Sequence, residues 1–443
     1  MPAPAEPSAT NPAAAFLRRE WRVLLFFLAL MAVTALVATL VDRGHDPLWQ
    51  RDLPHEIDSV SYAPSGDRIY VLQTLVNNGT PIALTALDAQ GRTVWEAPLD
   101  ASSVRFAAGD GFVAVATAPS PSNLTVLSAR DGRLLWETLI TRGFTTGLDA
   151  DGDLLAMALP APAEVQVFRR GADNFTQVAS LAFPEENLNV VRAVAVHRGT
   201  VAAGDEQGNL VVWRNGSRLL TTQVPLKVLS LALADGGDRL LVGGASLTPG
   251  DLTGRVMGFD LRAPTASQAT RWDDPVAGSV RFLALTDGGA QGLALVNAPG
   301  GPQVRGYPDA ANAGGGWSVG VDKVVRDALA NRGAAVDLDP AGAGVAYVNN
   351  IGGSVTLLDA ATGEERWTYR AVGGNALDYA PGGGAFVVAA RTLTGQPVTT
   401  LLYFEEAREP FWLDLSRLVP ALIALEALMA IGAIAVRGLW ARR

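Results

Sequence analysis

A two-part pattern repeats along most of this chain, and it restricts the possible folds more than any other feature. The first part is an apolar run around a glycine turn, as in VSYAPSGDRIYVL. The second joins an apolar run and a small turn to a tryptophan, as in LTALDAQGRTVW, which ends at Trp95. Further good copies of the second part end at Trp136 and Trp367. The copies recur about every 40 to 50 residues, which is the size of one β-propeller blade.

Each part of the repeat predicts two strands joined by a tight hairpin. Apolar residues alternate along the strands, and Asp-Gly, Gly-Gly and Asn-Gly pairs supply the positive φ angles that such hairpins need. Two hairpins make a four-stranded antiparallel sheet, which cannot bury both of its faces alone. We therefore expect an all-β fold, an eight-bladed β-propeller, from eight copies of the first part. Seven blades is the alternative, because the fifth and sixth repeats are irregular.

The last repeat is incomplete, and its missing strand is predicted at the other end of the chain. The phrase VTTLLYFEE supplies a third strand, after which the repeat stops. The segment PLWQRDL at Pro47–Leu53 resembles the fourth-strand phrases TVWEAPL and LLWETLI. We expect this N-terminal strand to complete the last blade, so that both ends of the propeller leave from one blade.

Two apolar segments flank the repeat. Residues 20–41 contain the uncharged run VLLFFLALMAVTALVATLV, and residues 415–436 contain LVPALIALEALMAIGAIAV. About 20 such residues span a bilayer core as a helix, so we predict one transmembrane helix at each end. For the first segment the alternative is a cleaved signal peptide, with the cleavage site at Val33-Thr34-Ala35.

Arginines set the predicted orientation of these helices. They precede the first apolar run and follow the second in residues 437–443. Because basic flanks stay in the cytoplasm, we expect a two-pass protein of the cell membrane with both termini cytoplasmic. The propeller, residues 45–413, is then extracytoplasmic. The Pro/Ala-rich residues 1–19 are predicted to form a disordered cytoplasmic tail.

Glu426 lies near the middle of the second predicted helix, where a charge is costly. Counted from the outer ends of the two runs, Thr34 would lie at a similar depth in an antiparallel helix pair. We expect a protonated Glu426 to hydrogen-bond a neighbouring helix, with Thr34 as the candidate contact. A partner subunit's helix and a proton-relay role are the alternatives.

The tryptophan phrase resembles a known repeat. LDAATGEERW at Leu358–Trp367, with the copies ending at Trp95 and Trp136, is similar to the repeat of pyrroloquinoline-quinone (PQQ)-type β-propellers. That superfamily contains quinoprotein alcohol dehydrogenases and non-catalytic members such as the propeller lipoprotein of the bacterial outer-membrane barrel-assembly machinery. WD-repeat propellers share the architecture. The resemblance implies the fold more than an activity.

The catalytic members of that superfamily imply a cofactor floor, a calcium or lanthanide site and often a vicinal cysteine pair. This chain has no cysteine, and its three histidines have no metal-ligand spacing. We predict no catalytic residues and no cofactor, and hence a protein that is not an enzyme. A net charge of −9 without a dense Lys/Arg run outside the termini also argues against nucleic acid as a partner.

One acidic phrase is a candidate calcium site. Asp149, Asp151 and Asp153 alternate as in the opening of a calcium loop, whose carboxylates offer hard oxygen ligands. Leu154 stands where such a loop needs glycine, and no bidentate glutamate follows at the required distance. A hairpin turn is the alternative interpretation.

Four Asn-X-Ser/Thr sequons fall in predicted loops of the first four blades and none in the last four. They begin at Asn78, Asn123, Asn174 and Asn215. The motif predicts N-glycosylation on an external face. Hairpin chemistry is the alternative, because Asn-Gly is itself a turn signal.

The leading functional hypothesis is a protein-interaction scaffold or accessory subunit that holds a membrane or exported protein partner. A propeller presents loops on two broad faces, and anchoring at both ends would keep one edge near the membrane. The alternatives are a quinoprotein-like oxidoreductase and a ligand-binding receptor or sensor that acts through a partner. The sequence names neither the partner nor a small-molecule ligand.

Overall fold

A computed structural model of the chain describes two compact units, residues 47–406 and the two terminal segments 1–46 and 407–443. Within them it describes these residues: 21, 25–34, 47–75, 80–99, 103–118, 122–140, 145–160, 163–171, 174–184, 190–263, 265–312, 316–321, 335–349, 353–369, 373–391, 397–406, 427–429 and 432.

The predicted membrane segments lie mostly outside the described residues. Residues 25–34, which include Thr34, and residues 427–429 are helical. Glu426, the rest of the first apolar run and most of the second are not described. Among the helices that are described, none combines the length and apolarity needed to cross a bilayer. The transmembrane helices and the Glu426 contact stay predictions.

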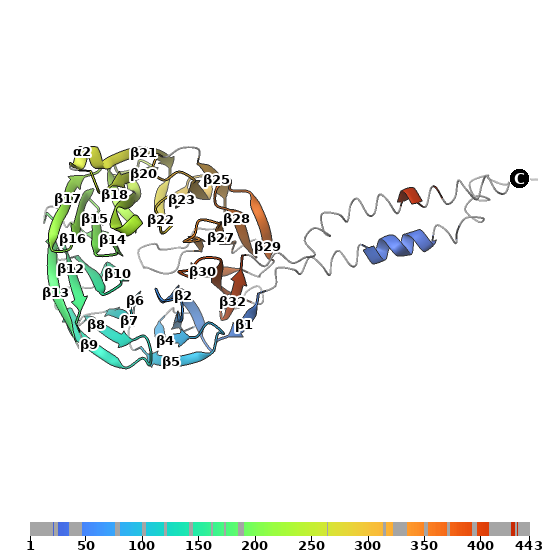
Figure 1. The fold of residues 1–443 in the computed structure, drawn as a ribbon, viewed down its shortest axis with the longest axis horizontal. Helices are drawn as coiled ribbons and strands as arrows, with labels where there is room; N and C mark the ends of the chain where they lie inside the picture. The colour runs from blue at the N-terminus through green and yellow to red at the C-terminus, as the bar shows by residue number, and fades with distance from the viewer. Residues whose placement is uncertain are drawn as a thin grey trace, which may run out of the picture. The chain divides into compact units, whose positions relative to one another are not determined.

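Residues 47–406 form eight four-stranded antiparallel sheets, here called blades 1 to 8, arranged as a ring (Figure 1). The first four blades are made of β2(Glu56–Tyr62), β3(Ile69–Thr74), β4(Pro81–Leu87), β5(Thr93–Pro98); β6(Ser103–Gly109), β7(Phe112–Ala118), β8(Ser122–Ser128), β9(Leu134–Ile140); β10(Gly147–Asp151), β11(Leu154–Pro160), β12(Ala163–Arg170), β13(Phe175–Ala182); and β14(Val191–His197), β15(Thr200–Asp205), β16(Asn209–Arg214), β17(Ser217–Gln223).

The other four blades follow the same order. They are made of β18(Leu226–Ala234), β19(Arg239–Ser246), β20(Thr253–Asp260), β21(Thr270–Ala277); β22(Ser279–Leu285), β23(Gly292–Ala298), β24(Gly301–Tyr307), β25(Trp317–Gly320); β26(Val336–Leu338), β27(Gly344–Asn349), β28(Ser354–Asp359), β29(Glu365–Tyr369); and β30(Gly374–Tyr379), β31(Ala385–Ala390), β32(Thr400–Glu405) with β1(Trp49–Asp52). Short helical turns, η2(Asp235–Gly237) and α2(Ala266–Ala269), occur in blade 5. The eight-blade prediction is confirmed, and the irregular fifth and sixth repeats are complete blades.

The hydrophobic core lies between neighbouring blades rather than inside any one of them. Tyr70, Leu84 and Trp95 of blade 1, for example, pack in one cluster with Phe106 and Val113 of blade 2. Because the strands alternate their side chains between two faces, each blade offers one apolar face to each neighbour. The apolar contacts between neighbouring blades therefore hold the ring together.

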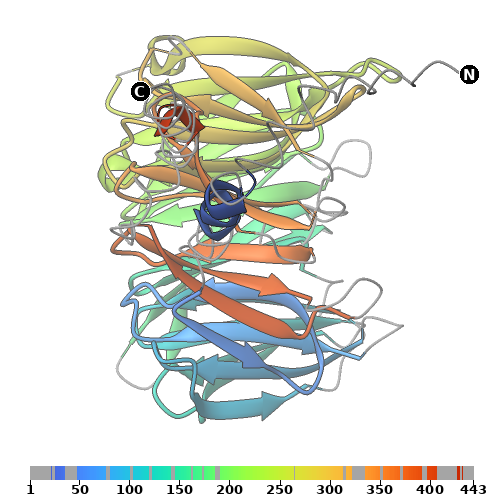
Figure 2. The same cartoon turned by 90° about the vertical axis from the view of Figure 1, so that its right-hand side faces the viewer.

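The ring closes as the sequence predicts. β1 pairs with β32, so the last sheet has the order β1-β32-β31-β30, and the ring of Trp49 stacks on Tyr403 at 5.3 Å between centroids. Asn375 Nδ2 of blade 8 donates to the carbonyl oxygen of Ile57 in blade 1 at 2.7 Å. Figure 2 shows the orange-red strands of blade 8 beside the blue strands of blade 1. The strand predicted at Pro47–Leu53 is the closing strand.

The tryptophan of the repeat contacts the next blade through the small residues of that blade's own phrase. Trp95 Nε1 donates to the carbonyl oxygen of Ala129 at 3.0 Å, and its indole packs on Gly132. The same donation from blade to blade recurs in three further pairs: Trp49 to Ala89, Trp272 to Ala310 and Trp317 to Ala360. Each copy of the LDAxTGxxxW phrase therefore supplies a tryptophan that contacts the next blade, and a small-residue turn that accepts the tryptophan of the preceding blade.

Gly132 is the sharpest test of this contact. Its φ is +71°, and a Cβ there would lie 2.8 Å from Cδ2 of Trp95. Gly132→Ala is expected to lower the free energy of unfolding by about 2 to 4 kcal/mol, from the positive φ and from displacement of the indole. Urea unfolding followed by tryptophan fluorescence measures it.

Gly152 provides the matched control, because its φ is +59° and no atom lies within 4 Å of the position that an added Cβ would take. Gly152→Ala should cost only the backbone term of about 1 kcal/mol. Equal losses in the two variants would show that the indole contact contributes nothing.

Candidate functional site

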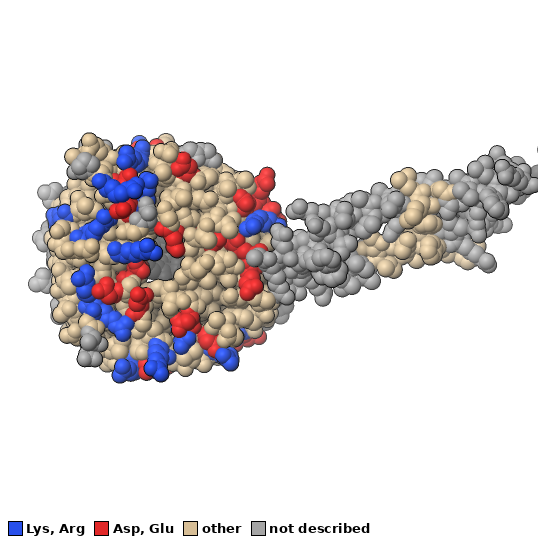
Figure 3. Space-filling view, in the orientation of Figure 1, with Lys and Arg blue, Asp and Glu red and all other residues tan. Residues whose placement is uncertain are grey.

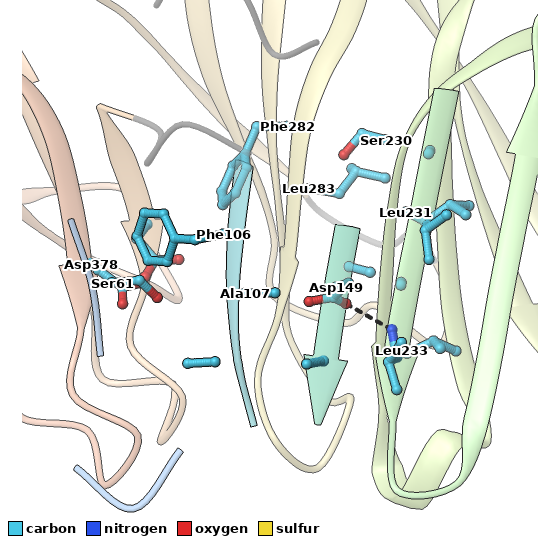
Figure 4. Close-up of a pocket in the computed structure, with 18 of the residues that line it drawn as sticks. Ser61, Phe106, Ala107, Asp149, Ser230, Leu231, Leu233, Phe282, Leu283 and Asp378 are labelled. Atoms are coloured by element: carbon cyan, nitrogen blue, oxygen red, sulfur yellow. Dashed lines mark hydrogen bonds between the residues drawn. The ribbon is translucent and has the colours of Figure 1, made fainter. Parts of the chain in front are cut away.

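The inner strands of the blades surround a cavity of about 480 Å³ at the centre of the ring. Its apolar lining includes Phe106 of β6, Phe282 and Leu283 of β22, and Leu231 and Leu233 of β18 (Figure 4). A volume of this size is typical of pockets for small molecules.

Three aspartates on inner strands line the cavity, and each carboxylate is bound by the backbone of the following blade. Asp149 accepts a hydrogen bond from the amide of Val196 at 2.7 Å, drawn as a dashed line in Figure 4. Asp337 accepts from the amide of Tyr379 at 3.0 Å. Asp378 accepts from the amide of Tyr62 at 2.6 Å and so joins blade 8 to blade 1.

Burial raises the pKa of all three carboxyl groups. The pKa of Asp149 rises to about 7, because burial outweighs the Val196 amide that favours the carboxylate. Burial raises the pKa of Asp337 to about 6. Burial, and then repulsion from Asp337, raise the pKa of Asp378 well above its ordinary value. Because a negative charge on Asp337 disfavours a second one on Asp378, these two carboxyl groups titrate as a pair.

The two arginines of the cavity wall are held by their own blades. Arg192 forms an ion pair with Glu206 at 2.6 Å, and Arg281 Nε donates to Ser279 Oγ at 3.0 Å. The carboxylates of Asp149, Asp337 and Asp378 form no ion pair with Lys or Arg among the described residues. The charged side chains of the wall therefore hold strands together, and the cavity lining combines polar and apolar groups.

The candidate calcium residues are placed by a hairpin, as the alternative interpretation predicted. Asp149 and Asp151 lie in β10, and Gly152 and Asp153 form the turn before β11. Asp151 Oδ2 accepts from the amide of Arg198 of blade 4, and Asp153 pairs with Arg169 at 3.3 Å. No group of three metal-ligating side chains occurs in the part of the chain that the structure describes. Calcium binding by these residues stays a prediction.

The sequons have different surroundings. Asn78 lies outside the described residues. Asn123 was predicted in a loop, which is wrong: it lies in β8, and its Nδ2 donates to Glu137 Oε1 at 3.1 Å. Asn174 is exposed directly before β13, and Asn215 is exposed in the β16–β17 turn with φ +46°. Asn215-Gly216 acts as a hairpin turn, and glycosylation at these sites stays a prediction.

Sequence reasoning missed Asp337, Asp339 and Asp378. Asp339 is buried and accepts from the amide of Gly384 of blade 8 at 3.3 Å, so the pair Asp337 and Asp339 repeats the arrangement of Asp149 and Asp151. The signal was present as the phrases DAD in repeat 3 and DLD in repeat 7. Both phrases mark a strand whose carboxylates hold the next blade.

Asp149 predicts a specific dependence of stability on pH. Its folded pKa of about 7 lies above the unfolded value near 4, so the folded state keeps a proton that the unfolded state loses. The contribution of Asp149 to the free energy of unfolding is fully present below about pH 4, and it is lost as the pH rises to 7. Asp149→Asn keeps an acceptor for Val196 and removes this loss.

We expect Asp149→Asn to change the free energy of unfolding little near pH 4 and to raise it by about 1 to 4 kcal/mol near pH 8. Denaturant titrations at several pH values measure the difference. Asp153→Asn, at a side chain that is 59% exposed, is the control. A constant difference between Asp149→Asn and the unaltered protein across this range would contradict the assignment.

Comparisons with solved structures show the same fold at low sequence identity. The Dos1 propeller aligns with a TM-score of 0.60 at 12% identity, covering 82% of this chain and 96% of that one. Sqt1 of Chaetomium thermophilum, solved bound to the N-terminus of ribosomal protein L10, aligns at 0.58 and 14%, covering 82% and 100%. The computationally designed Ika8 protein aligns at 0.56 and 14%, covering 80% and 98%.

No curated protein has a sequence similar enough to count as a relative. A protein family does match by its sequence profile, the one described as outer membrane protein assembly factor BamB, over residues 34–288. This match spans more than half of the chain and covers the closing strand β1 together with blades 1 to 5. It agrees with the PQQ-type resemblance of the tryptophan phrase. The chain is therefore a member of the BamB-type family of PQQ-like β-propellers.

Proposed function

We propose that this protein is a non-catalytic interaction scaffold, anchored in a membrane at both ends, whose extracytoplasmic propeller holds a membrane or exported protein. Membership of the BamB-type family carries the proposal, because the family description is that of an assembly factor of outer membrane proteins. Members of such a family act by binding other proteins, so a protein partner follows more directly than a substrate.

The chemistry of the central cavity supports a scaffold over an enzyme. Asp149, Asp337 and Asp378 are the acidic groups of its wall, and each is bound to the backbone of the next blade. A general acid or base must reach a substrate proton. Groups that hold the ring together are poorly suited to that work, because moving them would loosen the contacts between blades.

The position of the propeller's two ends supports anchoring at both. β1 begins at Trp49 and β32 ends at Glu405, and these strands are neighbours in one sheet. The apolar run 23–41 precedes Trp49 by seven intervening residues, and the run 418–436 follows Glu405 after twelve. Two helices that leave from one blade would fix a single edge of the ring near the bilayer and leave both broad faces open.

The absence of cysteine from the sequence allows a direct test of this orientation. Asp131→Cys places a thiol in the β8–β9 turn, at a side chain that is 52% exposed. A membrane-impermeant maleimide should label it in intact cells. Arg442→Cys, in the predicted cytoplasmic tail, should react only after permeabilisation. The reverse pattern would place the propeller in the cytoplasm and remove the extracytoplasmic scaffold.

The scaffold itself predicts a stable protein partner. A tagged full-length chain, cross-linked in intact cells and purified in mild detergent, should carry the same membrane or exported protein in every preparation. Cells that express the untagged chain provide the control for the affinity step. Recovery of the chain alone after cross-linking, at its normal expression level, would contradict the scaffold.

A further inference from the structure

Arginines form a row across one end of blade 4. The β14–β15 and β16–β17 turns lie at the same end of this sheet, because successive antiparallel strands reverse direction. Arg198 lies in the first turn, Arg214 ends β16, and Arg218 follows the second turn. Thr200 pairs with Arg214 and Trp213 with Arg218, so these side chains belong to adjacent strand ends.

A second row crosses the same end of blade 5. Arg239 begins β19 opposite Asp260 of β20, and Arg262 and Arg271 flank the following turn. All three surround the buried carboxylate of Asp260, at 3.9, 3.0 and 3.0 Å respectively. Hydrogen bonds and attraction from these arginines hold the pKa of Asp260 far below its ordinary range. One carboxylate thus faces three guanidinium groups, and an excess of positive charge remains.

The two rows belong to one surface. Arg214 of blade 4 forms an ion pair with Asp238 of blade 5 at 2.8 Å. We call this surface the arginine face; among the described side chains it joins six arginines to two aspartates: Arg198, Arg214, Arg218, Arg239, Arg262, Arg271, Asp238 and Asp260. Its net positive charge contrasts with the −9 of the whole chain.

The same end of blades 6 to 8 carries the opposite charge. In the described turns and strand ends there, Arg366 lies among eight carboxylates: Asp287, Asp309, Asp339, Asp359, Glu364, Glu365, Glu405 and Glu406. Arg366 is itself paired with Glu406 at 3.1 Å. Figure 3 shows blue side chains over blades 4 and 5 and, mixed with red ones, over blades 1 to 3, whereas mainly red side chains lie over blades 7 and 8.

Two arginines of the arginine face, Arg198 and Arg218, form no ion pair among the described residues. Arg198 has φ +42°, an unusual conformation for a residue with a side chain, and the Asp151 carboxylate holds its amide there. Its side chain and that of Arg218 are exposed. The side chains of Arg262 and Arg271 are 53% and 48% exposed. A turn kept in a costly conformation with an exposed guanidinium is a common property of binding surfaces.

We propose that the arginine face binds an acidic segment of the partner protein, an inference that rests on the scaffold function. Guanidinium forks match carboxylates in bidentate geometry. The acidic end of blades 6 to 8 repels the same segment and so orients it over blades 4 and 5. A short acidic segment fits two adjacent blades, whereas a long polyanion such as a nucleic acid would also meet the acidic half of the ring.

The test uses the full-length protein and a fluorescein-labelled peptide of ten glutamates, followed by fluorescence anisotropy. The peptide should bind in about 50 mM salt and be released in about 500 mM salt. Arg198→Gln combined with Arg218→Gln should weaken binding about five-fold or more, since each removes a charge without exposing a buried partner. A peptide of ten lysines should not bind.

Arg92→Gln combined with Arg133→Gln is the matched control, because these arginines are exposed at the same end of blades 1 and 2. It should leave the affinity for the glutamate peptide unchanged. Absence of peptide binding, equal weakening by both double variants, or equal or tighter binding of single-stranded DNA or phosphatidylglycerol vesicles would each overturn the proposal. None of these outcomes alters the cross-linking result, so the arginine face can fail while the scaffold stands.

Discussion

The structure depends on contact between neighbouring blades. No blade can bury its own faces, so the ring is stabilised by the contacts between each sheet and the next. Two kinds of polar contact accompany the apolar packing: an indole N–H that donates to an alanine carbonyl, as from Trp95 to Ala129, and a carboxylate that accepts a backbone amide, as in Asp149 with Val196. Both contacts connect one blade to the next.

This requirement explains the composition of the central cavity. A carboxylate on an inner strand must reach the inner strand of the next blade. It therefore lies on the wall of the central cavity and is shielded from solvent. The raised pKa of Asp149 and Asp378 is the physical result of this position rather than a sign of acid–base chemistry. Perturbed groups in a cavity usually suggest an active site, but here their partners are backbone amides of the fold itself. The surface that we propose to be functional is instead the arginine face, where arginines of blades 4 and 5 are exposed.

Much of the fold could be predicted because the repeat records local requirements. Gly132 and Trp95 occupy the glycine and tryptophan positions of two successive copies of one phrase, so the repeat contains both partners of a contact that the structure then showed. The closing strand at Pro47–Leu53 was found because it keeps the apolar and tryptophan spacing of a fourth strand. Asn123 was placed wrongly in a loop, because a sequon carries no information on pairing with β9. Asp337 was missed, since its role depends on which amide of the next blade lies opposite, and no local pattern states that.

The use of β1 as the last strand of blade 8 governs how the molecule can be made. Trp49 to Asp52 leave the ribosome first among the propeller residues, yet their partners, Thr400 to Tyr403, are synthesised last. For most of translation the nascent chain holds an unpaired strand at its beginning, and contacts of such long sequence separation form slowly. Until then the growing array has two open edges, each a template for pairing with another chain. The ring thus closes late, when β1 pairs with β32. This pairing removes the two open sheet edges that favour aggregation.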